Sequence, residues 1–293
     1  MRIVSLLPAA TELLYAAGGG DLLVGRSHGC DWPPPAQAPA LQRLPALTRA
    51  HAPHAIDEAA LAALRPDLIL TQDLCQACGV DRDAVERVAA GLATRPRVIS
   101  FAPRSLWQVL DDLLLLGEAI GRPGPATHAA TQLRDRAWTA AEQASPFTDG
   151  PGVLFLEWID PPFVGGHWTP ELIAMAGGAH PLNAPGAKSR RVDPAAIVES
   201  APERVVVCPC SVPLDAVRAA MPALAAQPWW RALPAVRDSR EKDSVMLVDG
   251  DQMFNRPGPR LVDALEWLAA WINGRPEIAP PGFPCERWQA PPA

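Results

Sequence analysis

The chain has 293 residues and a formal net charge of -6, with 26 basic and 32 acidic residues. A chain of this length can form two domains of ordinary size, each with a core of its own. The basic residues are scattered along the sequence, which excludes a nucleic-acid-binding stripe, and no apolar run reaches the roughly 18 residues that a membrane-spanning helix needs.

The N-terminal segment, Met1–Leu7, has a single positive charge and a short apolar run before Pro8. A secretory signal has a longer apolar region followed by a small-residue cleavage site. The chain as written is therefore expected in the cytoplasm, or in the periplasm if a leader has been removed.

A strand-loop-helix unit occurs twice along the chain. The apolar run at residues 3–6 leads to a short helix that ends at Gly19, and the run at 153–156 leads to a helix that ends at Gly178. In both copies we expect a threonine N-cap, an acidic residue in the first turn and a glycine at the end of the helix. The repeat indicates a duplicated architecture, although any two α/β units share this order of elements.

The following unit is repeated as well. Residues 61–67 form a helix stopped by proline before the apolar run 68–70, and residues 197–203 precede the run 205–207 in the same way. Continuous apolar runs are typical of strands that are buried on both faces of a parallel sheet. The sequence therefore predicts an α/β fold with two Rossmann-like lobes, each built on a mostly parallel sheet.

A long helical region separates the two copies. Residues 106–120 show helical spacing, Gly121–Gly124 interrupts it, and an alanine-rich helix continues over 126–144. We interpret the second stretch as a single long helix that joins the lobes. The predicted divisions are an N-terminal lobe at 1–122, a joining helix at 123–148, and a C-terminal lobe with a proline-rich tail at 149–293.

In open parallel sheets, ligands bind beyond the carboxyl ends of the strands, so a cleft between the lobes is expected. Loops after the predicted strands are rich in aromatic, cysteine and histidine residues. The candidate ligand-binding residues are Trp32, Glu157, Trp158, Phe163, His167, Trp168, Asp249, Phe254, Asn255 and Arg256. The rings at 158, 163, 168 and 254 would cover a large flat ligand, and the polar groups at 249, 255 and 256 would hold its substituents. Ordinary loop packing, and a plain ion pair between Asp249 and Arg256, are the alternatives.

A second group of residues has the donor types that zinc prefers. His28 and Cys30 follow one predicted strand, while Cys75 and Cys78 follow another at C-x-x-C spacing. Loops that follow parallel strands emerge at the same edge, so these four side chains are candidates for a tetrahedral zinc site. Reduced thiols that pack a loop are the alternative reading.

Several segments together resemble a known family. These are the opening Arg2–Leu13, the segments Asp31–Pro34 and Arg65–Ile69, Pro161–Phe163, and Phe254–Arg260. They are similar to periplasmic binding proteins with a helical joint, which carry cobalamin, haem and iron-siderophores, and most of all to a leaderless cobalamin-binding branch. The resemblance extends from Arg2 to about Ile272. It implies cobalamin as the ligand and an ABC permease as the partner.

The functional prediction is a non-catalytic binding protein for cobalamin or a related corrinoid or metal chelate, of the ABC-importer type. The alternative is a cytosolic metal-binding protein or enzyme that uses the cysteine and histidine residues in the same cleft. The sequence has no G-x-S-x-G elbow, P-loop or HExxH motif, which favours binding over catalysis.

Overall fold

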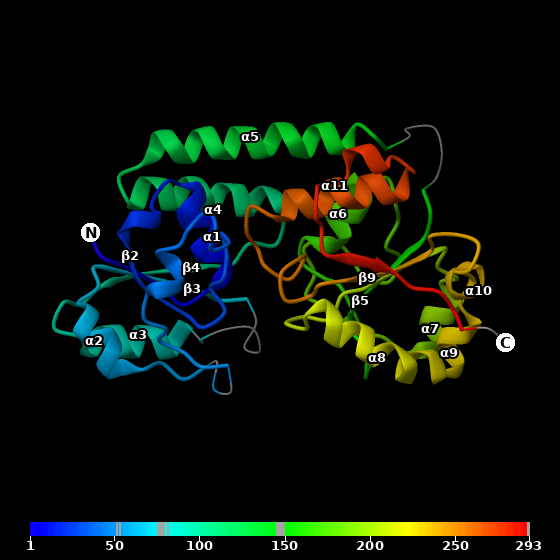
Figure 1. Ribbon diagram of the computed structural model, residues 1–293, viewed down its shortest axis with the longest axis horizontal. Coiled ribbons are helices and arrows are strands. Elements are labelled where there is room, and N and C mark those ends of the chain that lie inside the picture. Colours follow the sequence, from blue (N-terminus) through cyan, green and yellow to red (C-terminus); the bar gives the residue numbers. More distant parts are fainter. Residues whose placement is uncertain (51, 53, 75–79, 81, 145–149, 292–293) are drawn as a thin grey trace. The chain divides into compact units, whose positions relative to one another are not determined.

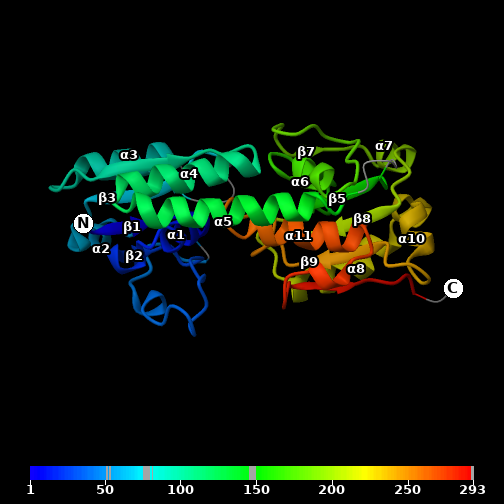
Figure 2. The same ribbon diagram turned by 90° about the horizontal axis from the view of Figure 1, so that it is seen from above.

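The computed structural model describes residues 1–50, 52, 54–74, 80, 82–144 and 150–291. The chain divides into two compact units. The N-terminal unit comprises Met1–Pro103 and Trp107–Leu133, and the C-terminal unit comprises Arg104–Leu106 and Arg134–Ala293. The boundary falls inside the helix α5 (Pro123–Ala141), which is drawn as one uninterrupted helix in Figure 2.

The N-terminal unit is built on a four-stranded sheet in the order β2-β1-β3-β4, with every neighbouring pair parallel. Its strands are β1 (Ile3–Ser5), β2 (Leu23–Arg26), β3 (Leu68–Gln72) and β4 (Arg97–Phe101). Its helices are α1 (Pro8–Ala16), α2 (Glu58–Leu64), α3 (Arg82–Gly91) and α4 (Leu106–Ala119), with the 3-10 turns η1 (Gly20–Leu22) and η2 (Leu41–Arg43). All five residues of β3 are buried, as expected for a strand covered on both faces.

The C-terminal unit contains a six-stranded sheet in the order β10-β9-β8-β5-β6-β7. The strands are β5 (Val153–Trp158), β6 (Phe163–Val164), β7 (Arg190–Arg191), β8 (Arg204–Val207), β9 (Val245–Val248) and β10 (Cys285–Arg287). Strands β5, β8 and β9 are parallel to one another. At one side β10 is antiparallel to β9, and at the other β6 is antiparallel to β5 and β7 is antiparallel to β6.

Helices cover both faces of this second sheet (Figure 1). On one side lie α6 (Thr169–Met175) and α11 (Leu261–Ile272), which contact each other, followed by the turn η3 (Pro276–Ile278). On the other side are α7 (Pro194–Glu199), α8 (Leu214–Ala226), α9 (Pro228–Ala232) and α10 (Pro234–Asp238). The predicted α/β fold class with two largely parallel sheets is confirmed.

The helix starts differ from the sequence expectation. α1 begins at Pro8, so Thr11 lies inside the helix, where its hydroxyl donates to Ser5 Oγ at 2.9 Å. α6 begins at Thr169, and the N-cap residue Trp168 makes no capping bond through its side chain. The expectation of threonine N-caps was therefore wrong. Proline occupies the first turn of each helix instead, and its fixed φ angle and missing N–H suit it to that position.

Helix termini elsewhere follow the expected rules. Asp57 accepts a hydrogen bond from Ala60 N at the start of α2, and Asp193 accepts one from Ala195 N at the start of α7. Such caps satisfy backbone donors that have no partner within the helix. Among the helices of the described residues, none is both long enough and apolar enough to cross a membrane.

Candidate functional site

The carboxyl ends of three parallel strands of the C-terminal unit lie next to one another. Val207 pairs with Leu156 on one side and with Leu247 on the other, so β5, β8 and β9 end together. The loops that follow them, residues 157–168, 208–211 and 249–257, form what we call the carboxyl edge. The structure thus brings most of the predicted ligand-binding residues to one end of one sheet.

Two of these loops are tightly joined. Ser211 N donates to Gly250 O at 3.0 Å, and Gly250 N donates to Val212 O at 2.9 Å. A Cβ atom at Gly250 would lie 1.9 Å from Pro209 O, so a residue with a side chain does not fit there. The close approach of the two backbones requires glycine and fixes the geometry of the carboxyl edge between β8 and β9.

Asp249 organises the loop after β9. Its Oδ1 accepts hydrogen bonds from Asp251 N at 3.0 Å and Gln252 N at 2.9 Å, and its Oδ2 accepts one from Leu214 N at 3.2 Å. The residue is only 7% exposed. Leu214 is the first residue of α8, so the carboxylate also caps that helix. Asp249 therefore has a supporting role in this loop.

Asn255 and Arg256 also bind the backbone of these loops. Asn255 Nδ2 donates to Gly250 O at 2.9 Å and to Cys208 O at 3.3 Å. Arg256 Nε donates to Asp251 O at 2.6 Å, and its guanidinium pairs with the Asp251 carboxylate at 3.2 Å. The ion pair considered between Asp249 and Arg256 is thus replaced by one between Arg256 and Asp251. These hydrogen bonds hold the loop after β9 in its shape.

Two aromatic residues predicted to cover the ligand are buried. Phe254 is 1% exposed and packs edge-on against Phe155 with ring centroids 5.0 Å apart, and Trp168 is 6% exposed. Trp168 Nε1 donates to Phe254 O at 2.6 Å, which fixes the strained left-handed backbone of Phe254 at φ 60°. In this structure both rings belong to the core beneath the carboxyl edge, because a large apolar ring gains more from burial than from exposure to water.

Trp158 is the aromatic residue that the carboxyl edge does expose. Its side chain is 44% exposed, and its Nε1 donates to Asp160 O at 3.1 Å. Trp158 pairs with Phe163 across the β5-β6 ladder, and Phe163 is partly exposed. An exposed indole beside a second ring gives a surface on which a flat ligand can stack.

His167 and Glu157 complete the predicted set on this unit. Burial, together with the positive charges of Arg104 and Lys188, lowers the pKa of the His167 imidazole. Its Nε2 is buried and has no hydrogen-bond partner among the described residues. Glu157 Oε2 accepts a hydrogen bond from Ser189 Oγ at 2.8 Å. The neutral imidazole and the nearby cations favour an acceptor or anionic group on a ligand.

Arg104, Lys188 and Ser189 were not predicted from the sequence. Arg104 precedes the predicted helix at 106–120, and the other two lie next to the edge strand β7, in a stretch without aromatic, cysteine or histidine residues. The basic run from Lys188 to Arg191 was the available signal, but only the fold places it near His167.

The remaining predicted residues lie in the N-terminal unit. Trp32 is partly exposed, and His28 is exposed with its Nδ1 2.8 Å from Thr48 Oγ1. Cys30 is fully buried, and its Sγ lies 3.0 Å from Thr11 Oγ1. Cys75 and Cys78 lie outside the described residues. Within the part of the chain that the structure describes, no group of three or more histidine, cysteine, aspartate or glutamate residues could hold a metal ion, so zinc remains a prediction without support.

Comparison with known proteins agrees with this fold. The sequence profile of a periplasmic binding protein family matches residues 3–240, which is more than half of the chain. The chain belongs to this periplasmic binding protein family. The family resemblance noted in the sequence is thereby confirmed.

Individual relatives are similar over almost their whole length. The vitamin B12-binding protein of Vibrio cholerae is 28% identical over 276 residues, 93% of this chain and 89% of the relative. That of Photorhabdus laumondii is 26% identical over 277 residues, 93% of this chain and 88% of the relative.

Solved structures of periplasmic binding proteins share the fold. A periplasmic heme binding protein from Pseudomonas aeruginosa matches with a TM-score of 0.73 and 25% identity, covering 93% of this chain and 92% of that one. The periplasmic vitamin B12 binding protein of Vibrio cholerae matches with a TM-score of 0.69 and 23% identity, covering 94% and 98%. These comparisons are all with binding proteins, and we assign no catalytic residue.

Proposed function

We propose that this periplasmic binding protein is the substrate-binding component of an ABC importer and that its ligand is a corrinoid of the cobalamin type. The observation that carries the proposal is the similarity over 93% of the chain to proteins named for binding vitamin B12. Family membership supports a location in the periplasm, rather than the cytoplasm that the N-terminal segment indicated. The partner would be the permease of the importer.

The carboxyl edge of the C-terminal unit has features that suit a flat ligand. Trp158 offers an exposed indole with Phe163 next to it, and the supporting residues Asp249 and Asn255 fix the neighbouring loops. A stacked aromatic ring adds apolar contact area without requiring much ordering, because its side chain has few rotatable bonds. We infer that Trp158 makes the main aromatic contact from this unit.

Heme is the second candidate. A heme binding protein is among the solved structures with the same fold, and Arg104 and Lys188 lie close enough to His167 to lower its pKa. Two cations near the His167 imidazole suit the carboxylates of a porphyrin, whereas the amide side chains of a corrinoid do not require them.

Titration calorimetry with cyanocobalamin and with hemin tests the proposal. Trp158→Ala should weaken binding of the true ligand about tenfold, which corresponds to about 1.4 kcal/mol. Trp138→Ala is the matched control, because Trp138 is 58% exposed on α5 and is not part of the three loops of the carboxyl edge. Absence of heat with cyanocobalamin at protein concentrations well above micromolar, together with saturable binding of hemin, would reassign the ligand to heme.

A further inference from the structure

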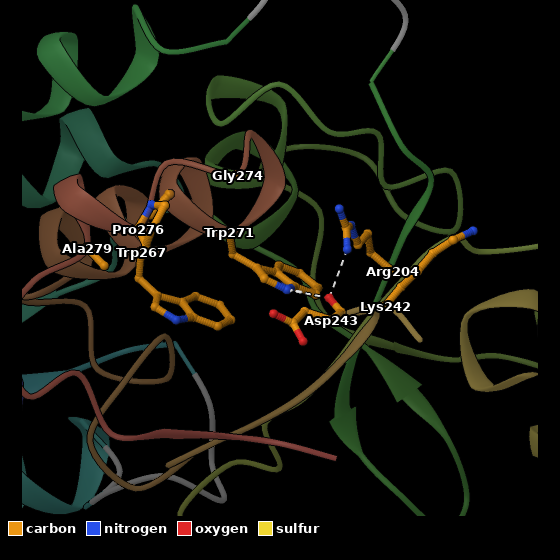
Figure 3. Close-up of a pocket in the computed structure, with 9 residues that line it drawn as sticks. Arg204, Lys242, Asp243, Trp267, Trp271, Gly274, Pro276 and Ala279 are labelled. Carbon is orange, nitrogen blue, oxygen red and sulfur yellow. Dashed lines mark hydrogen bonds between the residues drawn. The ribbon is translucent and has the colours of Figure 1, made fainter. Parts of the chain in front are cut away.

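A pocket of about 440 Å³ lies in the C-terminal unit at the opposite end of the sheet from the carboxyl edge (Figure 3). The end of α11, the turn η3, the start of β8 and the segment before β9 form its walls. Arg204 is the first residue of β8, whose carboxyl end is about 10 Å away at 3.3 Å per residue. The pocket is therefore separate from the proposed corrinoid site.

Two tryptophans form the apolar wall of this pocket. Trp267 is stacked between Trp271, with ring centroids 5.5 Å apart, and Phe283, with centroids 4.9 Å apart. Figure 3 shows Trp267 on one side of Trp271 and Arg204 on the other, and the Arg204 guanidinium carbon is 5.3 Å from the Trp271 ring centroid. Because the faces of these rings are occupied, they offer mainly their edges to the pocket. Aromatic ring edges carry partial positive charge.

Arg204 is the charge in the pocket that no carboxylate neutralises. Its Nη1 donates to Asp243 O at 2.8 Å, and across the described residues no ion pair forms with it. A guanidinium has five N–H donors, so most of its donors remain available. The other charges are paired: Asp243 with Arg287 at 2.8 Å, and Lys242 with Asp238 at 2.7 Å.

Lys242 does not serve as a second anchor. Figure 3 shows its ammonium directed away from the two tryptophans. The pKa of Lys242 is raised, first by its hydrogen bond to Asp238, while the charge of Arg204 acts in the opposite direction. The two cations are thus near enough to repel each other.

We propose that this pocket is a second ligand site, which binds a small organic acid with an aromatic or compact apolar body. The carboxylate of the ligand is held by the free N–H groups of Arg204, a pairing that is stronger than a neutral hydrogen bond. The apolar body lies against the edges of Trp267 and Trp271 and against Ala270 and Ala279. A volume of this size is within the range of small-molecule pockets.

The probe for the test is 1-naphthoate, with 1-naphthylmethylamine as the cation of matched shape. Calorimetry on the full chain should show that naphthoate binds with a dissociation constant below about 1 mM and at least tenfold more tightly than the amine. Saturating the protein with its corrinoid or heme should leave naphthoate binding unchanged. Competition between the two would place the probe at the carboxyl edge and overturn the proposal of a second site.

Two variants test the anchor and the cavity separately. Arg204→Gln should weaken naphthoate at least tenfold, whereas Arg237→Gln, which removes an exposed charge on α10 outside the pocket, should not. Ala279→Phe should abolish binding by filling the space without a change of charge. Arg204 also lies beside the last turn of α11, where a cation is favourable. If Arg204→Gln lowers the melting temperature but leaves naphthoate affinity intact, the residue serves only the helix and the proposal fails.

Discussion

Replacing Asp249 by alanine should destabilise the C-terminal unit and loosen the loops of the carboxyl edge. The carboxylate accepts three backbone hydrogen bonds, at 3.0, 2.9 and 3.2 Å, and is 7% exposed. Loss of a helix N-cap costs about 1 kcal/mol. Each further buried donor left without a partner costs about 1–3 kcal/mol, reduced where water can enter. We therefore expect the free energy of unfolding to fall by about 2–4 kcal/mol.

Asp249→Asn gives a graded comparison. The single carbonyl oxygen of asparagine can keep the bonds to Asp251 N and Gln252 N, but its NH₂ group would face Leu214 N, which is also a donor. The loss of stability should therefore be intermediate. Asp215→Ala serves as the control, because Asp215 is an exposed acid in the first turn of α8 that accepts a bond from the adjacent Ala216 N.

Urea unfolding measures the stability, and native-state hydrogen exchange locates the effect. Exchange of the amide protons of residues 214, 251 and 252 should accelerate more in Asp249→Ala than exchange in the centre of β8. A change of less than about 0.5 kcal/mol, the usual range for a surface substitution, would refute the supporting role of Asp249. Equal acceleration of exchange throughout the unit would instead indicate that the loss of stability does not originate at the three hydrogen bonds of Asp249.

Three further outcomes follow from particular contacts. Burial, and to a lesser extent the charge of Asp111, raises the pKa of Asp112 from 3.8 to about 7. Between these values the folded chain keeps a proton that the unfolded chain loses. The free energy of unfolding should therefore fall as the pH rises from about 4 to about 7. Asp112→Asn should remove this pH dependence of stability and stabilise the chain at pH 8 by about 1–2 kcal/mol. The full linkage would be about 4 kcal/mol, but solvent screens the charge at a partly exposed site. Urea unfolding at pH 5 and at pH 8 measures the difference. Gly250→Ala should lower the melting temperature and weaken binding of the corrinoid, since its Cβ would collide with Pro209 O, and a variant with wild-type melting and affinity contradicts the close approach. Arg136→Gln breaks the ion pairs with Asp263 at 2.5 Å and Glu266 at 2.7 Å. It should lower the free energy of unfolding by only about 1 kcal/mol, because the arginine is partly exposed. A loss above about 3 kcal/mol in thermal unfolding would show that these ion pairs behave as buried ones.

Local sequence patterns were sufficient for the fold class. The apolar runs at 68–70 and 205–207 became the buried strands β3 and β8, because a strand covered on both faces has no polar positions to interrupt the run. The duplicated strand-helix order likewise predicted two sheets. Short antiparallel strands were not predicted: β7 consists of two exposed arginines, and β10 follows a proline-rich segment, so neither has an alternating pattern.

The sequence by itself placed most candidate ligand residues on loops at one edge of a sheet, but only the tertiary structure decided what each side chain does. Phe254 and Trp158 are both loop-associated aromatic residues, yet one is 1% exposed and the other 44%. Similarly, the hydrogen bond from Leu214 N to Asp249 joins residues 35 positions apart. Exposure and long-range hydrogen bonding depend on which distant segments pack against a loop, and that information is absent from the residues of the loop itself.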